Sequence, residues 1–251
     1  MNILTVKNVT KVFGKFRAVD NVSIEIQSKH VNLIMGPNGS GKTTLLNCIS
    51  GFYKPDQGNI IFDGMDVTGK PPHEIARRGL IRTFQIPAPF FKLSILENLL
   101  AAYQHNPGEK LFHSLFKRTW LKKEREAVRK AQEVLSLLNL NHLASIPAEN
   151  LSGGQLKLLE MGRALMTEAK MILLDEPVGS VNPTLAHQIF KYIQTIREER
   201  EITFLMIEHR LDIAMQYVDI VCAMIGGKIV CQGKPDEVLH NEEVINSYLG
   251  G

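Results

Sequence analysis

The sequence predicts an α/β fold with a mostly parallel sheet, an N-terminal antiparallel β subdomain and an inserted α-helical subdomain. Short aliphatic runs, such as MILLD at 171–175, alternate with helical stretches, as they do in parallel sheets that helices cover on both faces. The first roughly 30 residues instead alternate between apolar and polar side chains, which is typical of an antiparallel β layer. Residues 93–142 carry almost no strand signal and place apolar side chains at helical spacing.

Particular stretches justify each element in chain order. ILTVKNVT and VSIEIQ predict the first two strands, and Gly14 and Lys15 lie in the turn between them. HVNLIMGPNGSGKTTLLNCISG then predicts a buried strand, a glycine-rich loop and a helix, and this helix ends at Gly51. SILENLLAAY and EREAVRKAQEVLSLLNL predict helices of the insertion, and the aliphatic runs in MILLDEP, ITFLMIEH and DIVCAMIGG predict further central strands.

Composition places the chain among ordinary globular proteins. It has 251 residues, of which 44% are hydrophobic and 22% are charged, so it can bury a substantial core without disulfides. The formal net charge of +3 is too small to indicate a protein that coats nucleic acid. Cys48, Cys222 and Cys231 are odd in number and have no metal-ligand spacing, which favours a reducing, cytosolic compartment.

The sequence offers no sign of export or of membrane insertion. Its N-terminal stretch, MNILTVKNVTKVFGKF, lacks the apolar run and cleavage site of a signal peptide. No stretch approaches the roughly 18 apolar residues of a membrane span. Any role at a membrane is therefore expected to come through partner chains.

The glycine-rich loop GPNGSGKT at 36–43 matches the phosphate-binding pattern G-x-x-x-x-G-K-[ST]. It follows a predicted strand and opens a helix, which is the context that this motif requires. The Lys42 ammonium would neutralise β- and γ-phosphate oxygens and the Thr43 hydroxyl would ligate Mg²⁺. A simple glycine-rich turn is the alternative. The expected nucleotide-binding residues here are Gly36, Pro37, Asn38, Gly39, Ser40, Gly41, Lys42, Thr43 and Thr44.

An acidic pair follows the predicted strand at 171–175. Asp175 would end this strand at the edge of the sheet where ligands bind, and it would hold Mg²⁺ through water. Glu176 follows directly, and successive side chains on a strand point to opposite faces. We therefore expect Glu176 to face the attacking water as a general base. The alternative is a solvated acidic pair.

A second anion site is expected at LSGGQ, residues 151–155. Ser152 is a favoured N-cap, and Gly153 and Gly154 leave backbone N–H groups uncovered at a helix N-terminus. Glycine at two successive positions indicates that another group approaches this backbone closely.

LSGGQ, followed by an LLDE strand, resembles the signature stretch of the ATP-binding-cassette (ABC) family, and the resemblance runs from Leu4 to about Leu249. It implies that Gln85 bridges Mg²⁺ or attacking water to a transmembrane partner and that His209 contacts the γ-phosphate. It also implies that Phe13 stacks on adenine, since stacking needs only an aromatic face. The plainer readings are a polar loop residue for Gln85, a strand-end histidine for His209 and a core residue for Phe13.

The resemblance also implies the domain organisation and the assembly. One ABC ATPase domain, 1–251, would consist of a β layer with a RecA-like core in 1–92 and 168–251, and a helical subdomain in 93–167. Ser152 to Gln155 of one copy would close over ATP bound at Lys42 of another, in a head-to-tail homodimer or a heterodimer with a related subunit. A lone chain would then hydrolyse ATP slowly. Asn182 stands where this family commonly has Asp, which puts the coupling between the two sites in doubt.

Within the family, RTFQIPAPFFKLSILENLLAA, MIEHRLDIAM and the tail INSYLGG resemble the ATPase of branched-chain amino acid importers. This resemblance implies ATP and Mg²⁺ as cofactors and a peripheral position on the cytoplasmic face of the membrane. It implies transmembrane permease partners, an indirect link to an extracytoplasmic solute-binding protein, and no nucleic acid. The alternatives are an importer ATPase for another small solute such as urea, a soluble cassette acting on nucleic acid or ribosomes, and a P-loop kinase.

The insertion 109–126 is basic and amphipathic. Its apolar residues, Leu111 to Leu121, are spaced for one helix face, and Lys and Arg occupy the rest. The simplest interpretation is a helix packed on its own subdomain with a solvated basic face. The alternative is contact with anionic lipid or with the permease.

Overall fold

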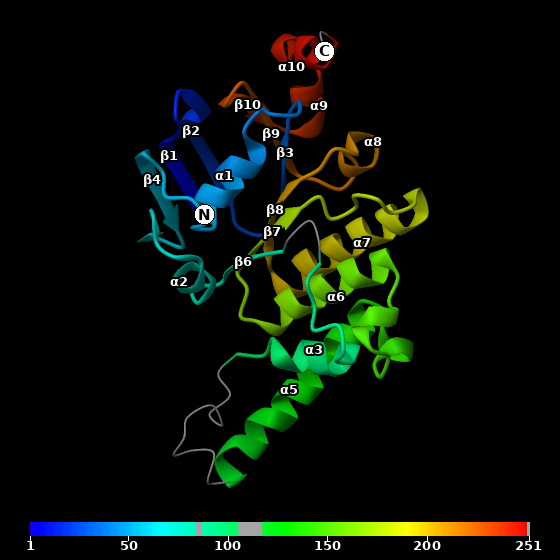
Figure 1. The fold of residues 1–251 in the computed structure, drawn as a ribbon. Coiled ribbons are helices and arrows are strands. Elements are labelled where there is room, and N and C mark those ends of the chain that lie inside the picture. The colour runs from blue at the N-terminus through cyan, green and yellow to red at the C-terminus, as the bar shows by residue number, and fades with distance from the viewer. Residues whose placement is uncertain (84–86, 105–116, 250–251) are drawn as a thin grey trace. The chain divides into compact units, whose positions relative to one another are not determined.

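The computed structural model describes residues 1–83, 87–104 and 117–249. Its internal contacts divide the chain into two compact units, Met1–Gln85 with Ala169–Gly251, and Ile86–Glu168. Figure 1 shows the elements of both units. The sequence predicts that the helical subdomain begins at residue 93, where helical spacing of apolar residues starts. In the structure Asn98 ties this stretch to the helical unit, with its Nδ2 donating to Phe90 O at 3.0 Å.

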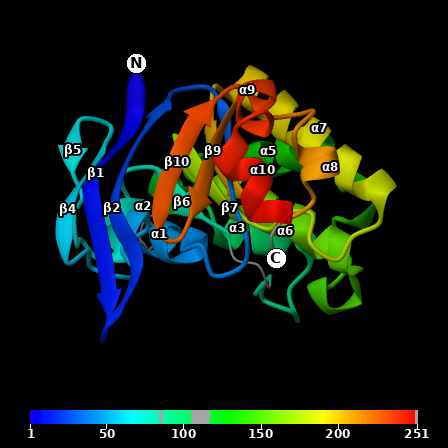
Figure 2. The ribbon, with the colours of Figure 1, turned by 90° about the horizontal axis from the view of Figure 1, so that it is seen from above.

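The first unit contains the predicted antiparallel layer, a sheet with the strand order β2-β1-β4-β5. Figure 2 shows β1, β2 and β4 side by side. Phe13 and Phe16 face each other across the turn that contains Gly14, whose φ of 60° suits glycine. The prediction of this layer is confirmed. Its strands are β1 (Asn2–Phe13), β2 (Phe16–Gln27), β4 (Gln57–Phe62) and β5 (Met65–Asp66).

A second sheet, with the order β10-β9-β3-β8-β7-β6, confirms the mostly parallel core. Among the described strands of this second sheet, only β10 runs antiparallel to its neighbour, β9. The central strands are continuous apolar runs because both of their faces are covered. The strands are β3 (Val31–Met35), β6 (Leu80–Arg82), β7 (Met171–Asp175), β8 (Thr203–Ile207), β9 (Ile220–Ile225) and β10 (Lys228–Gly233).

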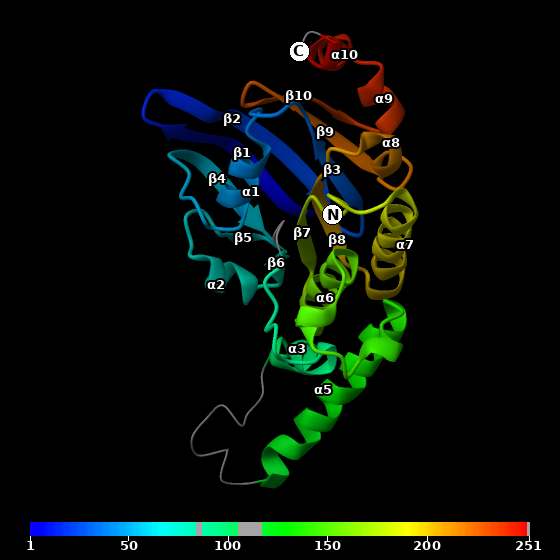
Figure 3. The same ribbon diagram turned by 45° about the vertical axis from the view of Figure 1, so that its right-hand side comes forward.

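Helices cover this sheet within the first unit. Helix α1 (Lys42–Ile49) shares one buried core with alternate residues of β3, β7, β8 and β9 and with the antiparallel layer. Helix α7 (Pro183–Arg200) contacts β3 and β8 (Figure 3). Its fully buried apolar side chains are Ala186, Ile189, Phe190, Ile193 and Ile196. The shorter helices are α2 (Pro72–Ala76), α8 (Leu211–Ala214), α9 (Pro235–Leu239) and α10 (Glu242–Leu249).

The second unit is helical, as predicted. Its helices α3 (Ile95–Ala101), α5 (Lys117–Leu137) and α6 (Gly153–Met166) contact one another. A Cβ at Gly162 would lie 2.9 Å from the Leu99 side chain, so glycine allows α3 and α6 to pack closely. Part of the basic insertion, residues 109–116, lies outside the described residues. No helix in the described parts of the chain is long and apolar enough to cross a membrane.

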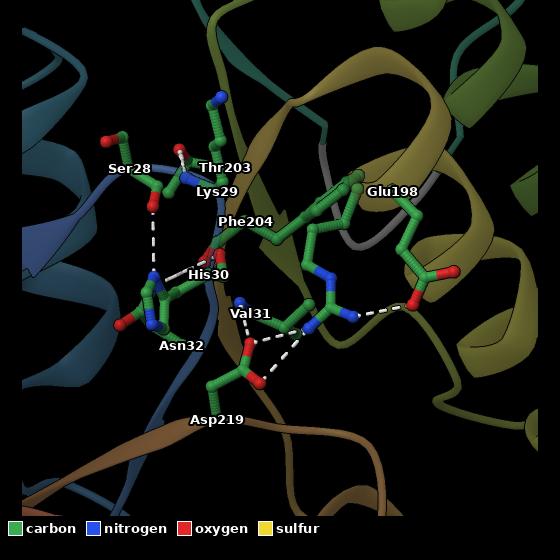
Figure 4. Close-up of polar contacts among 10 residues, drawn as sticks. Ser28, Lys29, His30, Val31, Asn32, Glu198, Thr203, Phe204 and Asp219 are labelled. Atoms are coloured by element: carbon green, nitrogen blue, oxygen red, sulfur yellow. Dashed lines mark hydrogen bonds and ion pairs between the residues drawn. The ribbon is translucent and has the colours of Figure 1, made fainter.

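A polar network fastens the first unit at the edge where β3, β8 and β9 begin (Figure 4). Asp219 Oδ2 accepts the Val31 N–H at 2.8 Å, and both Asp219 oxygens accept from Arg197 Nη1, at 3.1 and 3.0 Å. The Lys29 N–H donates to Thr203 Oγ1 at 2.8 Å. The loops that follow these strands lie at the opposite edge of the sheet. The network therefore stabilises the strands without involving those loops.

Candidate functional site

The strand order brings three loops together at one edge of the parallel sheet. β3, β8 and β7 are neighbours in the sheet and parallel, so the segments that follow them lie side by side. Lys42, Glu176 and His209, from these three segments, line one pocket of about 330 Å³. The residues lining it are Phe16, Ala18, Asn38, Gly39, Gly41, Lys42, Thr43, Thr44, Glu176 and His209.

The loop between β3 and α1 needs glycine at two positions for steric reasons. A Cβ at Gly36 would lie 2.0 Å from the Met224 carbonyl oxygen, and one at Gly41 would lie 2.1 Å from that of Ala18. Gly41 also has a φ of 101°, which L-amino acids with side chains rarely adopt. The loop therefore lies against the backbone of β2 and β9, and this packing fixes its course.

The helix that follows this loop presents an uncovered N-terminus. Its N-cap, Gly41, provides no side-chain cap, and its first turn contains no acidic residue. The free backbone N–H groups and the helix dipole together favour an anion at this point. Ser40, which is buried, closes the loop with a backbone N–H bond to Pro37 O at 3.2 Å.

Lys42 is the cation of this site and is buried. Its Nζ donates to the carbonyl oxygens of Gly36 at 2.8 Å and Pro37 at 2.9 Å. Burial lowers the pKa of Lys42, and the nearby carboxylates of Glu176 and Asp175 oppose that shift. An ammonium that is removed from water in this way gains from pairing with a phosphate oxygen.

Asp175 and Glu176 face different surroundings. Asp175 ends β7 and its Oδ2 lies 2.9 Å from Arg82 Nη2. Glu176 lies in the pocket, where its Oε1 is 3.3 Å from His209 Nε2. The two side chains were expected to point apart because side chains alternate along a strand, and this reason is wrong. Glu176 lies beyond the strand, and its left-handed backbone, with φ of 52°, sets the direction of its side chain.

The predicted N-cap of the signature stretch is confirmed in the second unit. Ser152 caps α6, accepting from Gln155 N at 3.3 Å, while Gln155 Oε1 accepts from Ser152 N at 2.9 Å. Gly153 is exposed, and a Cβ there would meet nothing within 4 Å. The packing of the chain on itself therefore gives no reason for glycine at 153.

Comparisons with known proteins identify this arrangement. A family model described as ABC transporter matches residues 19–179. A probable branched-chain amino acid transport ATP-binding protein LivG of Archaeoglobus fulgidus is 46% identical over 250 residues, covering 100% of this chain and 96% of that protein. The chain belongs to the ABC transporter family. It is therefore an ATPase with the fold of an ATP-binding cassette.

Further relatives of the cassette agree over its whole length. A LivG protein of Methanocaldococcus jannaschii is 47% identical, covering 100% of this chain and 98% of that protein. A solved ATP-binding cassette in its ADP conformation has a TM-score of 0.86 and 46% identity, with 100% of both chains covered. A model described as branched-chain amino acid ATP-binding cassette transporter matches residues 228–251.

Two aromatic residues of the cassette lie near the turn between β1 and β2. Phe16 lines the pocket and is 62% exposed. Phe13, the residue expected to stack on adenine, packs edge-to-face on Tyr53 at 5.3 Å between ring centroids and is 44% exposed. Sequence reasoning missed Phe16. Its position opposite Phe13 in a short hairpin was the available signal.

The cassette has two further polar residues beside the site that sequence reasoning missed. The first is Arg82, which donates to Asp175 and also to Asn47 Oδ1 at 2.5 Å and Ser50 Oγ at 3.0 Å. Asn47 lies on α1, and Ser50 follows that helix directly. Glu208 is buried and accepts the backbone N–H groups of the two loops that carry Glu176 and His209. Arg82 precedes the expected Gln85 and Glu208 precedes His209, and this adjacency was the only signal.

The sequence also singled out Gln85 and Asn182 of the cassette. Gln85 lies outside the described residues, so its expected role stays a prediction. Asn182 is the N-cap of α7, and its side-chain oxygen accepts the Leu185 N–H at 2.9 Å. Asp is also a favoured N-cap, so Asn at this position keeps the helix cap while removing a charge.

The donor groups of the cassette fit Mg²⁺ bound together with a nucleotide. Mg²⁺ usually takes one or two protein oxygens and completes its shell with phosphates and water. Thr43 supplies a hydroxyl in the pocket, and Asp175 supplies a carboxylate at the adjacent strand end. The described residues include no cluster of three or more His, Cys, Asp or Glu side chains that could hold a metal on their own. This donor set suits a metal that arrives with phosphates.

Proposed function

We propose that this cassette binds ATP in the pocket of Lys42, Glu176 and His209 and hydrolyses it to power the import of branched-chain amino acids. The single observation that carries the chemistry is the convergence of these three residues at one sheet edge, beside an uncovered helix N-terminus. The names of the relatives and the match at residues 228–251 support the transported solute. The cassette would act at the cytoplasmic face of the membrane with transmembrane permease subunits.

Each residue of the pocket has a role in this proposal. The loop N–H groups of 36–41 and the Lys42 ammonium bind the β- and γ-phosphates. Glu176 takes a proton from the attacking water, and His209, 3.3 Å from Glu176, contacts the γ-phosphate. Mg²⁺, held by Thr43, Gln85 and Asp175, would supply positive charge that neutralises the phosphates.

The proposal includes a second cassette, either a copy of this chain or a related subunit. The N–H groups of Gly153 and Gly154 lie in the first turn of α6, where a helix has no acceptors of its own for them. The open space at Gly153 leaves room for a group from another molecule. One relative with 26% identity and a TM-score of 0.74 is described as a dimeric post-hydrolysis state bound to ADP and Pi. We expect Ser152 to Gln155 to bind ATP held by the partner cassette.

Replacing Glu176 by Gln tests the shared site. Gln keeps the size of the side chain but removes the base, so hydrolysis should fall at least about 100-fold while ATP binding persists. Sedimentation velocity with saturating ATP should then show a dimer that ADP does not produce. For the unmodified chain, ATPase activity per molecule should rise with protein concentration. A variant that stays monomeric with ATP and Mg²⁺, or a specific activity independent of concentration, would contradict the shared site.

The transported solute needs a separate experiment. The cassette should be reconstituted in proteoliposomes with two permease chains and a solute-binding protein from the same organism. ATP-dependent uptake of leucine, isoleucine or valine supports the proposal, and uptake of urea alone overturns the solute assignment. Copurification of the native protein with nucleic acid or ribosomes instead of permeases would overturn the transport function.

A further inference from the structure

A buried carboxylate joins the two loops that carry Glu176 and His209. Glu208 Oε1 accepts the backbone N–H of Val178 at 2.8 Å. Its other oxygen, Oε2, accepts the N–H groups of His209 at 2.8 Å and Arg210 at 3.1 Å. Glu208 is only 2% exposed, so these backbone donors replace water as partners of its carboxylate.

We propose that Glu208 is a positioning residue that fixes the distance between Glu176 and His209 and thereby sets the rate of hydrolysis. The inference rests on the proposed function, because it assigns a role in the same pocket. Glu208 lies outside the residues that line the pocket, so it acts through its neighbours and not on the nucleotide.

The loop geometry explains how a bond at Val178 controls Glu176. The Gly179 N–H donates to Glu176 O at 3.1 Å, so residues 176–179 form a tight turn. Glu176 itself has a left-handed backbone, which persists only where its surroundings hold it. Val178 is fully buried within this turn, and its N–H points to Glu208. Holding Val178 therefore holds the turn that directs the Glu176 side chain.

The same carboxylate holds the other partner of the pair. His209 and Arg210 follow Glu208 in the loop after β8, and both of their N–H groups donate to Glu208 Oε2. A second link runs parallel to it, because Arg210 Nη1 donates to Val181 O at 3.3 Å. These two links add to the bond that the Glu176 N–H donates to Ile207 O at 3.0 Å at the strand end. The side chains that the two loops carry into the pocket, Glu176 and His209, lie 3.3 Å apart.

Glutamine at 208 is the sharpest substitution to test this role. A carboxylate has two accepting oxygens, whereas an amide has one and presents an NH₂ group to the N–H donors on its other side. Glu208→Gln should therefore release one loop while changing the size of the side chain very little. A misplacement of catalytic groups by about 1 Å can lower a rate by about 100-fold. We expect kcat of ATP hydrolysis to fall at least tenfold and KM for ATP to change less than threefold.

Asp219→Asn provides the matched control. Asp219 also accepts a backbone N–H, that of Val31, but it does so at the opposite end of the sheet. Its substitution should lower the melting temperature and leave kcat within twofold of the unmodified protein. If both variants lower kcat equally at matched loss of melting temperature, Glu208 is merely structural and the proposal is wrong.

A double-mutant cycle separates positioning from a general effect. In a His209→Ala background, Glu208→Gln should lower the residual kcat far less than it does alone, because the pair that it positions is already broken. Full additivity would overturn the proposal. If Glu208→Gln does not fold, Arg210→Met, which removes the second link to Val181, gives the same comparison. An unmodified chain without ATPase activity contradicts the proposed function itself. An active unmodified chain, with normal kcat in both Glu208→Gln and Arg210→Met, contradicts only this inference.

Discussion

Arg82 holds the carboxylate of Asp175 in a nearly buried ion pair. The distance from Nη2 to Oδ2 is 2.9 Å, and the side chains are 6% and 11% exposed. Arg82 comes from β6 and also binds two side chains of the α1 segment, so it connects β7 to that helix. The residue expected to serve Mg²⁺ is therefore oriented by a cation from the same chain. This ion pair directs the carboxylate before any ligand binds.

Removing that cation should destabilise the fold. Arg82→Met leaves the Asp175 carboxylate buried without its partner, which should lower the free energy of unfolding by roughly 3 kcal/mol. Urea titration monitored by circular dichroism measures this change. Arg17→Met breaks an exposed ion pair with Asp20, 64% and 21% exposed, and should change the free energy of unfolding far less. An equal decrease in the free energy of unfolding in the two variants would show that the buried Arg82 pair stabilises the fold no more than an exposed pair.

Alanine at Gly41 should prevent nucleotide binding. Its Cβ would lie 2.1 Å from Ala18 O, so the phosphate loop must shift away from β2. Gly14→Ala is the control, because Gly14 also has a positive φ but a Cβ there meets nothing within 4 Å. Only the backbone cost of about 1–2 kcal/mol should appear in that variant. Isothermal titration with ATP should show binding by Gly14→Ala and none by Gly41→Ala.

Gly153→Ala should affect assembly but not the fold. The added methyl group has open space in this chain and alanine favours a helix, so the melting temperature should stay the same or rise. The methyl group would crowd a phosphate bound by the partner. In the Glu176→Gln background, we expect ATP-driven dimerisation to weaken at least tenfold in sedimentation experiments. Unchanged dimerisation would show that no partner group approaches Gly153.

The two aromatic residues of the first hairpin should differ in their effect on ATP affinity. Phe16 lines the pocket, whereas Phe13 packs on Tyr53. If Phe13 stacks on adenine as expected, Phe13→Ala should weaken ATP binding about tenfold or more, as loss of an aromatic contact commonly does. A larger loss of affinity in Phe16→Ala would transfer the stacking role to Phe16.

The cysteines give a test that depends on pH. Burial raises the pKa of Cys48 to about 11 and that of Cys222 to about 12, so both remain unreactive thiols at pH 8. Cys231 is only partly buried, although burial raises its pKa as well. Ellman's reagent should therefore label one thiol in the folded protein and all three in guanidinium. Because the reactive thiolate of Cys231 increases with pH, labelling should accelerate between pH 7 and 8. Cys231→Ser should remove the native labelling.

Sequence reasoning predicted what local patterns encode. The aliphatic run before Asp175 predicts a buried strand, and GPNGSGKT predicts the loop and helix that present Lys42. Both follow from the chemistry of a few consecutive residues. The direction of the Glu176 side chain could not be predicted in the same way, because it depends on one backbone angle beyond the strand end.

Contacts between residues that are distant in sequence could also not be predicted. Arg82 and Asp175 are 93 residues apart, and Glu208 and Val178 are 30 apart. Their pairing follows from the strand order, which places β6 beside β7 and β7 beside β8. Nothing in the spacing of a single sequence specifies that order. The sequence therefore predicts the groups that act on a nucleotide better than the groups that hold them in place.

The backbone at Glu176 implies a trade between stability and activity. A left-handed conformation costs a residue with a side chain roughly 1–2 kcal/mol, a cost that glycine would avoid. Since the total stability of a domain is typically only about 5–15 kcal/mol, this is an appreciable fraction to give up at one position. Selection for heat resistance alone would be expected to favour glycine at 176. Such a protein would be more stable, but it would lack the proposed general base and be catalytically inert. Efforts to make this cassette more thermostable should therefore leave position 176 unchanged.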